Sequence, residues 1–355
     1  DIDFTLEGIY NRDLNPCVVT NKNVYWDGKS TIWLAPFDER KYMSTYGRNQ
    51  AYVIENAGKK AYYWSLTAQL HKKFAFGLDL SAAYTHSRAK SYSEGIGDQV
   101  SSAYTNYRNS INAVNDHETG YATYVAPTRV LISASYKLKE GRNAASTFSL
   151  IYDGSENGYM GNYSYSRYSY IFNGNVTNDP SAPGNLIRIP ASREELNDWN
   201  FADNGQYTDA AGNRQTYTAD MQRDDFWAYI NQDDYLKDRK GQYAERGGAK
   251  MPWHHQLDFK FKQDFNLMVG GRKHTLQLGC DISNVLNMLN SDWGTYKQII
   301  GNNLLSYRAG NGKNGSNGSF TYNMMNGARH LATYQKYNSV ASTYKVMFSI
   351  RYIFD

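Results

Sequence analysis

The chain of 355 residues lacks the long apolar runs from which membrane helices are made. A helix that crosses a bilayer needs about 20 consecutive apolar residues, and no segment approaches that length. Apolar residues make up 41% of the sequence, below the roughly 45–50% of an ordinary soluble domain. The mean hydropathy is -0.69. The sequence therefore excludes a bundle of transmembrane helices.

Cysteine is almost absent. The two cysteines, Cys17 and Cys280, lie far apart, and neither belongs to a Cys-x-x-Cys pair or a Cys/His cluster. This spacing argues against a structural zinc site and leaves a disulfide between them open. The net charge is only +4 and the basic residues are scattered, so we expect no nucleic-acid partner.

Motifs of catalysis and cofactor binding are missing as well. The sequence contains no HExxH, GxSxG, CxxC, GxGxxG or phosphate-loop pattern. His254 and His255 are adjacent, and on a strand they point to opposite faces, so they cannot hold one metal ion together. We therefore expect no catalytic residues, no metal and no cofactor, and predict that the protein is not an enzyme.

Aromatic residues, by contrast, are abundant. They make up 15% of the chain, and 32 of them are Tyr. A disordered chain is poor in both hydrophobic and aromatic residues, so disorder is excluded. A polar chain rich in Tyr suits a surface whose rings lie between water and an apolar phase. On composition alone, a Tyr-rich soluble sandwich or carbohydrate-binding domain fits equally well.

Strict alternation of apolar and polar residues marks eight segments as β-strands with different environments on their two faces. Each has roughly 9–13 residues, the length that a tilted strand needs to cross a bilayer, whereas strands of soluble proteins have about 5–6. The eight segments are 1–10, 60–71, 74–86, 127–138, 143–153, 253–265, 272–284 and 342–354. The polar face of 253–265, expected to line the interior of a barrel, carries Asp258, Lys260, Lys262 and Asp264.

The connections alternate strictly between tight and long. The tight ones are 72–73, 139–142 and 266–272, and the long ones are 11–59, 87–125, 154–252 and 285–341. Transmembrane barrels have short periplasmic turns and long extracellular loops, whereas a soluble all-β protein has no reason to place every long loop at one end. If the last strand descends to the periplasm, all three tight turns lie there. We therefore predict an all-β fold, an antiparallel transmembrane β-barrel in a bacterial outer membrane.

The long connections are predicted to contain structure of their own. Segment 159–172 is interpreted as a hairpin arm, Ser192-Arg193-Glu194-Glu195 as a capping box that opens a short helix, and 219–236 as a second helix. Segment 310–319 is a flexible low-complexity stretch. Four loop tyrosines are candidates for a ligand entrance, although packing within the hairpin is favoured over that role: Tyr163, Tyr165, Tyr168 and Tyr170.

Three segments near the end carry a resemblance to a known family. The segments are GQYAERGGAKMPWHHQLDFKFKQDFNL (241–267), HTLQLGCDISNVLNMLNSDWG (274–294) and the terminal KVMFSIRYIFD. The first two resemble a region near the end of Oar-like TonB-dependent receptors, and the third resembles the aromatic-ended final strand of outer-membrane barrels. Here Phe354 is followed by Asp355, which departs from the usual terminal Phe.

This resemblance implies a 22-stranded barrel that holds an amino-terminal plug, binds ligand at its extracellular face and is energised through the TonB complex. The sequence contains no recognisable plug or TonB-contact segment, and its first residues already alternate like a strand without a signal peptide. We therefore expect residues 1–355 to be the C-terminal portion of such a barrel. Its expected partners are outer-membrane lipids, the plug and upstream strands of its own polypeptide, and the TonB complex.

Two other hypotheses stay open. A complete eight-stranded barrel would act in adhesion or anchoring, with its large loops as the working surface. A soluble Tyr-rich β-domain would bind glycans, and it predicts long loops at both ends of the sheets. For a receptor, a peptide, an oligosaccharide and a chelated metal are all compatible ligands.

Overall fold

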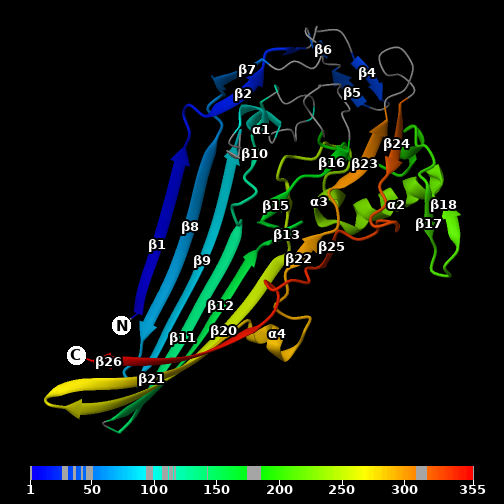
Figure 1. The fold of residues 1–355 in the computed structure, drawn as a ribbon. Helices are drawn as coiled ribbons and strands as arrows, with labels where there is room; N and C mark the ends of the chain where they lie inside the picture. The colour runs from blue at the N-terminus through cyan, green and yellow to red at the C-terminus, as the bar shows by residue number, and fades with distance from the viewer. Residues whose placement is uncertain are drawn as a thin grey trace.

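A computed structural model describes residues 2–25, 31–34, 37–40, 43–44, 51–92, 99–105, 111, 115, 117–141, 143–173, 185–308 and 318–354. Its largest element is an antiparallel sheet in which eight long strands lie side by side in chain order (Figure 1). All eight segments predicted as strands are confirmed. They are β1 (Ile2–Arg12), β8 (Tyr62–Lys73), β9 (Leu78–Ser91), β11 (Thr128–Glu140), β12 (Ala144–Glu156), β20 (Trp253–Val269), β21 (Arg272–Ser283) and β26 (Lys345–Phe354).

The register of this sheet separates apolar from polar residues. One row across the first six strands consists of Phe4, Leu70, Ala82, Ile132, Tyr152 and Leu257. The adjacent row consists of Asp3, His71, Ser81, Ser133, Ile151 and Asp258. Because side chains alternate along a strand, each row lies on one side of the sheet. We call these two sides the apolar face and the polar face.

The two faces need different surroundings. On the apolar face of β26, Phe348 is 78% exposed and Ile350 is 77% exposed, and apolar rows of this extent require an apolar phase rather than water. The polar face carries cross-strand pairs, such as Lys260 Nζ at 2.7 Å from Asp281 Oδ2. Asp264 Oδ1 likewise accepts a hydrogen bond of 2.8 Å from Gln277 Nε2. The residues predicted to line a barrel interior thus lie on the polar face.

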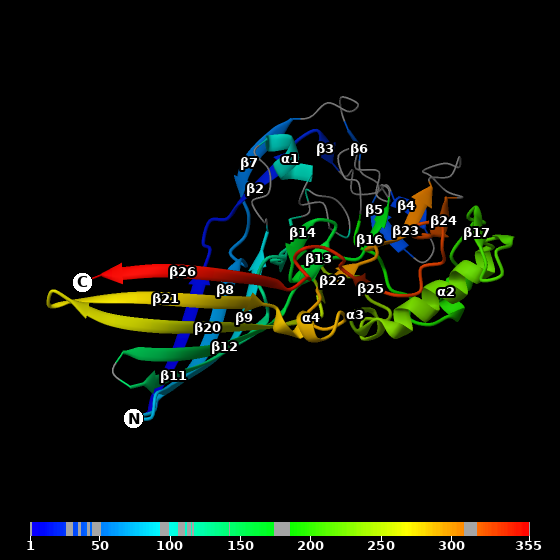
Figure 2. The same cartoon turned by 60° about the horizontal axis from the view of Figure 1, so that its bottom comes forward.

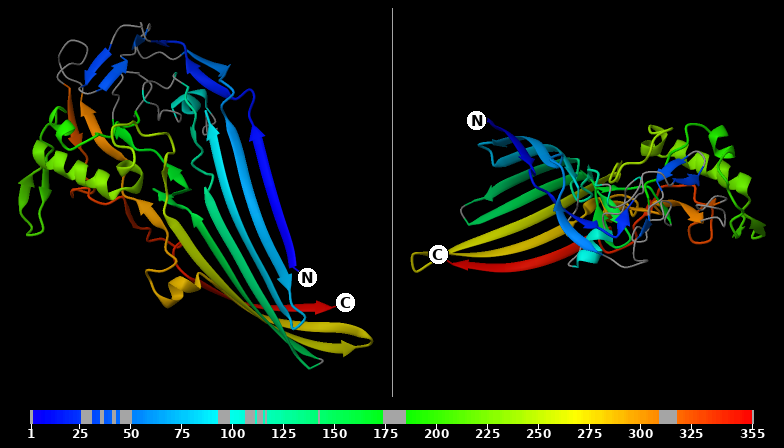
Figure 3. Two further views of the ribbon diagram at one scale, coloured as in Figure 1. Left: turned by 180° about the vertical axis from the view of Figure 1, so that it is seen from behind. Right: turned by 90° about the horizontal axis from the view of Figure 1, so that it is seen from above.

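The sheet is open. Among the described strands, β1 pairs only with β8, and β26 pairs only with β21. The two strands lie at opposite edges of the curved sheet (Figure 3), and every residue in both is exposed. The described part of the chain is therefore a curved wall, and the expected 22 strands and closed circumference are not observed in it.

Three tight turns lie at one end of the sheet (Figure 1). The predicted connection 266–272 shortens to Gly270 and Gly271, because β20 and β21 continue to the turn. Both glycines have positive φ, +57° and +80°, as a two-residue hairpin with the twist of its strands requires. Similarly, β9 begins at Leu78 rather than at 74, because Phe74 N donates to Leu78 O (2.7 Å) across the turn. The tight turns are thus confirmed, with shifted boundaries.

The long connections lie at the other end and contain short elements (Figures 1 and 2). The first two hold β2 (Cys17–Asn21), β3 (Val24–Tyr25), β4 (Thr31–Leu34), β5 (Phe37–Arg40), β6 (Met43–Ser44), β7 (Tyr52–Asn56), α1 (Val100–Thr105) and β10 (Gly120–Tyr121). The third holds β13 (Gly158–Met160), β14 (Tyr163–Tyr165), β15 (Arg167–Tyr168), β16 (Ile171–Asn173), η1 (Glu194–Asn197), β17 (Gln206–Thr208), β18 (Arg214–Thr216), α2 (Ala219–Gln232), α3 (Asp234–Lys237) and β19 (Ala249–Lys250). The fourth holds α4 (Val285–Leu289), β22 (Lys297–Ile299), β23 (Asn303–Arg308), β24 (Ser319–Tyr322) and β25 (Tyr334–Lys336).

The hydrophobic core lies in these connections rather than in the sheet. The third and fourth connections pack into one body, which we call the loop unit (the described residues of 157–252 and 284–341). Two parallel strand pairs join them, β13 with β22 and β16 with β23. The core of the loop unit includes the fully buried side chains of Trp199, Phe226, Tyr229, Leu304 and Phe320. Because each such side chain contributes about 1.5–3 kcal/mol on burial, the loop unit is held by a core of its own.

The predictions for the loop unit are confirmed in part. The Ser192 motif opens only the single turn η1, where Ser192 Oγ accepts from Glu195 N at 3.3 Å. The helix predicted at 219–236 is interrupted at Asp233, whose carboxylate accepts from the amides of Tyr235 and Leu236 and so begins α3. Segment 159–172 is not one hairpin arm, because β15 pairs with β19 and β16 with β23. Residues 310–317 of the low-complexity stretch lie outside the described part.

Two further findings concern membrane helices and cysteines. None of the helices in the described ranges is long and apolar enough to cross a membrane. Cys17 and Cys280 are both free thiols. The disulfide that the sequence left open is therefore not formed.

Candidate functional site

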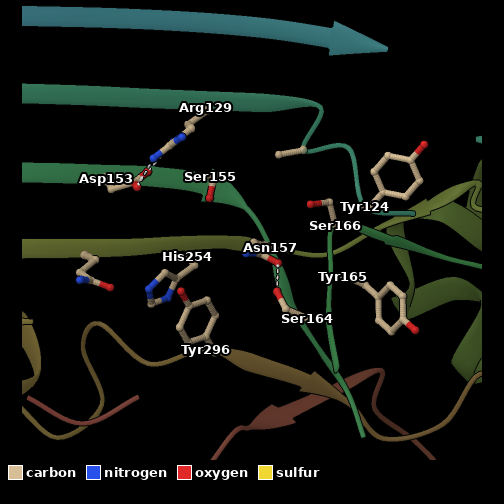
Figure 4. A pocket seen from close by; sticks show the side chains of 12 residues that line it. Tyr124, Arg129, Asp153, Ser155, Asn157, Ser164, Tyr165, Ser166, His254 and Tyr296 are labelled. Atoms are coloured by element: carbon tan, nitrogen blue, oxygen red, sulfur yellow. Dashed lines mark hydrogen bonds and ion pairs between the residues drawn. The ribbon is translucent and has the colours of Figure 1, made fainter. Parts of the chain in front are cut away.

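A polar pocket lies where β11, β12 and β20 meet the loop unit (Figure 4). The register places Arg129, Ser155 and His254 in one row of the polar face, and Asp153 and Gln256 in the next row. Alternation along three strands thus directs five polar side chains to the same side of the sheet at its loop end.

The opposite wall of the pocket comes from the loop unit and from the segment before β11. Its lining residues are Tyr124, Ala126, Asn157, Ser164, Tyr165, Ser166 and Tyr296, and the volume of the pocket is about 280 Å³. Asn157 Oδ1 accepts hydrogen bonds from Gly158 N and Ser164 Oγ, both at 2.9 Å, which fixes the turn that follows β12. The pocket is therefore formed between the rigid sheet and the body packed on its end.

Arg129 and Asp153 form the charged side of the pocket. Arg129 Nε lies 3.0 Å from Asp153 Oδ1, and Nη2 lies 2.6 Å from Oδ2. Two parallel hydrogen bonds of this kind fix the orientation of both groups. Because the pair is charge-balanced, it presents directed donors and acceptors without a strong preference for ligands of one sign.

His254 is the most confined polar side chain of the pocket. It is 5% exposed, and its ring stacks on that of Tyr296 with 3.5 Å between centroids and 11° between planes. The side chain of Gln256 and the backbone of Thr295 are the polar groups that act on this ring. His254 is therefore held by ring stacking and by polar neighbours within the pocket.

A glycine brings Tyr296 to this position. A Cβ on Gly158 would lie 2.7 Å from Lys297 O, so only glycine lets β13 approach β22 this closely. The strand β22 follows Tyr296 directly, and the close approach seats that ring against His254. Burial raises the pKa of the Tyr296 phenol above its ordinary value, so this hydroxyl remains protonated.

The four loop tyrosines of the sequence analysis separate into different roles. Tyr165 lines the pocket, and Tyr163 is 72% exposed. Tyr168 and Tyr170 are buried in the core of the loop unit, with their hydroxyls 3.2 Å apart. The preferred packing role is thus confirmed for two of the four.

The expectation that His254 and His255 lie on opposite faces is confirmed. His255 Nδ1 lies 2.7 Å from Tyr152 OH on the apolar face, away from the pocket. The described residues contain no cluster of three or more His, Cys, Asp or Glu side chains that could hold a metal ion.

Sequence reasoning did not single out Arg129 or Asp153, and it considered His254 only as a metal ligand and rejected that role. Each residue lies in a strand in which apolar and polar residues alternate. A single polar residue in such a strand is explained by contact with water as well as by a role in a binding site. Only the register between strands places them in adjoining rows.

A larger cleft of about 860 Å³ lies on the other side of the sheet. Its lining includes Glu156, Lys250 and Trp253 together with the helix α3. Trp253 and Glu156 are register partners in a row of the apolar face. This cleft therefore opens to the outside of the wall and not toward the polar face.

The comparisons with known proteins decide the class. A family model described as an outer membrane beta barrel domain matches residues 11–331. The chain belongs to this family. Searches of curated proteins and of solved structures return no match to it. The protein resides in the outer membrane. In barrels of this kind, an apolar face contacts lipid and a polar face lines the lumen. Barrels of this kind have short periplasmic turns and long extracellular loops.

Proposed function

We propose that this outer-membrane barrel protein is a TonB-dependent receptor that takes up a polar ligand, and that residues 1–355 form the C-terminal part of its barrel wall. The expected partners are the plug and the further strands of the same polypeptide, together with the TonB complex. The resemblance of 241–267 and 274–294 to Oar-like receptors supports this proposal. The role is binding and passage of a ligand, without covalent catalysis.

The open edges of the sheet carry the argument. Both β1 and β26 have one side without a partner strand among the described strands. In hydrocarbon, each backbone N–H or C=O group without a hydrogen bond costs several kcal/mol, so an edge of about ten residues cannot stay open. We infer that further strands pair with both edges in the membrane. A complete eight-stranded adhesion barrel would instead pair β1 with β26, which disfavours that hypothesis.

The pocket fits the receptor role by its place and its chemistry. It lies on the lumen side at the extracellular end, where a ligand captured by the loops would enter. Arg129 and Asp153 offer donors and acceptors, Tyr296 offers a hydroxyl, and His254 offers a polar ring. Such a lining suits a ligand rich in hydrogen-bonding groups.

Two measurements on the native polypeptide test the proposal. The protein is purified from outer membranes in detergent, its intact mass is measured, and its retention on immobilised periplasmic TonB domain is compared with that on a blank support. We expect a mass well above 40.5 kDa and specific retention. A mass equal to that of this chain, without retention on TonB, would contradict the proposal and restore the small-barrel hypothesis.

A further inference from the structure

Positive charge gathers around one tyrosine on the apolar face. Along β9 this face carries Leu80, Ala82 and Tyr84, but at the extracellular end it carries Arg88 and Lys90. Lys90 has Tyr62 and Tyr121 as register partners, and Arg88 has Trp64. Aromatic rings at this height are typical of the girdle between lipid tails and headgroups. The two cations therefore lie where the outer wall of the barrel meets the headgroups of the outer leaflet.

Three cations surround the ring of Tyr121. The distances to the ring centroid are 5.0 Å from Arg88 Cζ, 4.5 Å from Lys90 Nζ and 4.3 Å from Arg167 Cζ. Arg88 Nη2 also donates a hydrogen bond of 2.7 Å to Tyr121 OH. The ring attracts each cation through its face and holds the three together. We call Arg88, Lys90, Arg167 and Tyr121 the cation cluster.

The carboxylates near the cation cluster do not balance its charge. In the described part of the chain, neither Arg88 nor Arg167 has a carboxylate within salt-bridge distance. Lys90 Nζ lies 3.8 Å from Glu245, which also pairs with Arg239 at 3.3 Å. Glu156, the other carboxylate that acts on Arg167, is paired with Lys250 at 3.0 Å. The cluster thus holds excess positive charge on a surface that faces lipid.

Arg167 is the buried member of the cation cluster, and hydrogen bonds hold its guanidinium in place. It is 8% exposed, and its Nη1 donates to the carbonyl oxygens of Gly247 and Gly248, each at 3.3 Å. Burial lowers the pKa of this guanidinium, which reflects the cost of holding the charge away from water. A nearby anion offsets that cost. Arg88 is exposed and Lys90 is partly exposed, so these two residues are accessible to such an anion.

We propose that the cation cluster binds a phosphate group of a phosphorylated glycolipid in the outer leaflet. Arg88 and Lys90 contact the phosphate oxygens, while Tyr121 and Arg167 position them. Guanidinium and ammonium groups are the usual protein ligands of phosphate, and Arg supplies directed donors to its oxygens. The lipid source follows from the position, because the cluster lies on the outer wall at headgroup height rather than in the lumen.

The test compares two variants of the full polypeptide purified in detergent. Arg88→Gln/Lys90→Gln removes the two accessible cations. The matched control Lys72→Gln/Lys73→Gln removes two cations from the periplasmic end of β8. The probes are bis-phosphorylated lipid A, its dephosphorylated form and inorganic phosphate, with bound lipid measured by native mass spectrometry. Heat-modifiable electrophoretic migration reports whether each barrel is folded.

We expect the control to bind bis-phosphorylated lipid A like the wild type, and the Arg88→Gln/Lys90→Gln protein to bind it at least about tenfold more weakly, because two charge-assisted hydrogen bonds are lost. Dephosphorylated lipid should bind equally weakly to all three proteins.

Unchanged binding by the folded Arg88→Gln/Lys90→Gln protein overturns the proposal. Full competition by millimolar inorganic phosphate would reassign the cluster as a site for soluble anions. If the double variant does not fold, Lys90→Gln alone must still weaken binding, and Arg88→Lys must retain more binding than Arg88→Gln.

Discussion

His330 makes the stability of the loop unit sensitive to acid. It is 2% exposed, and its ring stacks on Tyr322 at 6.2 Å between centroids and an angle of 12°. The backbone of Ala332 is a hydrogen-bonding neighbour of this ring. Burial lowers the pKa of His330 from 6.5 to about 4, because the protonated form is poorly solvated there.

The direction of the pH effect follows from proton linkage. The unfolded loop unit binds the proton below pH 6.5, whereas the folded unit binds it only near pH 4. The stability that depends on a neutral His330 is therefore complete above the unfolded pKa and is lost as the pH falls toward the folded pKa. One differential proton corresponds to about 1.4 kcal/mol per pH unit, so the expected loss at pH 5 is about 2 kcal/mol.

Hydrogen exchange of the β24 amides in detergent-purified protein measures this loss as the free energy of opening at pH 7.5 and pH 5, after correction for intrinsic exchange rates. The variant His330→Phe keeps the aromatic stacking and removes the titrating group. Between pH 7.5 and pH 5, the opening free energy of the wild type should fall by about 2 kcal/mol more than that of the His330→Phe variant. Equal falls in both proteins would refute the reasoning.

Three further predictions concern single side chains. Arg329→Met leaves the buried Asp225 carboxylate without its guanidinium partner and should lower the unfolding free energy of the loop unit by about 2–3 kcal/mol in a urea titration. The Asp225→Asn/Arg329→Met double variant should recover part of this loss, and no recovery would contradict the role of the buried charge. Phe226→Ala opens a cavity in the fully buried core and should lower the unfolding free energy by about 3–5 kcal/mol in the same titration. Leu289→Ala, at a side chain that is 67% exposed, should lower it little, and equal effects would count against the assigned core. Gly270→Ala places a residue with a side chain at positive φ (+57°) and should lower the unfolding free energy by about 1–2 kcal/mol. It should also slow the folding of the barrel from urea into detergent micelles, and a neutral result would contradict the assigned turn.

The sheet follows from the sequence because its signal is local. A period of two residues is visible within each segment, and it fixes both the strand and its two faces. For this reason β20 and β26, in which apolar or aromatic residues largely alternate with charged or polar ones, are predicted with the correct faces. The boundaries near Gly77 and Gly270 shift because turn geometry depends on where the partner strand ends.

The pocket and the loop unit depend on contacts between residues far apart in the chain. Arg129, Asp153 and His254 come together only through the register of three strands. The pairing of β16 with β23 joins segments more than 120 residues apart, and no local pattern in 159–172 indicates it. The helix predicted at 219–236 is broken by the side chain of Asp233, whose hydrogen bonds to Tyr170 and Thr333 also tie it to the core.

The central claim is that the eight-stranded wall faces lipid on one side and an aqueous lumen on the other. Site-directed spin labelling along β20 in proteoliposomes tests it most directly, with single cysteines at Leu257, Asp258, Phe259 and Lys260 after Cys17 and Cys280 are replaced by Ser. We predict that labels at 257 and 259 collide mainly with oxygen dissolved in lipid, and that labels at 258 and 260 collide mainly with a water-soluble nickel chelate. Equal access of both reagents at all four positions would contradict the account.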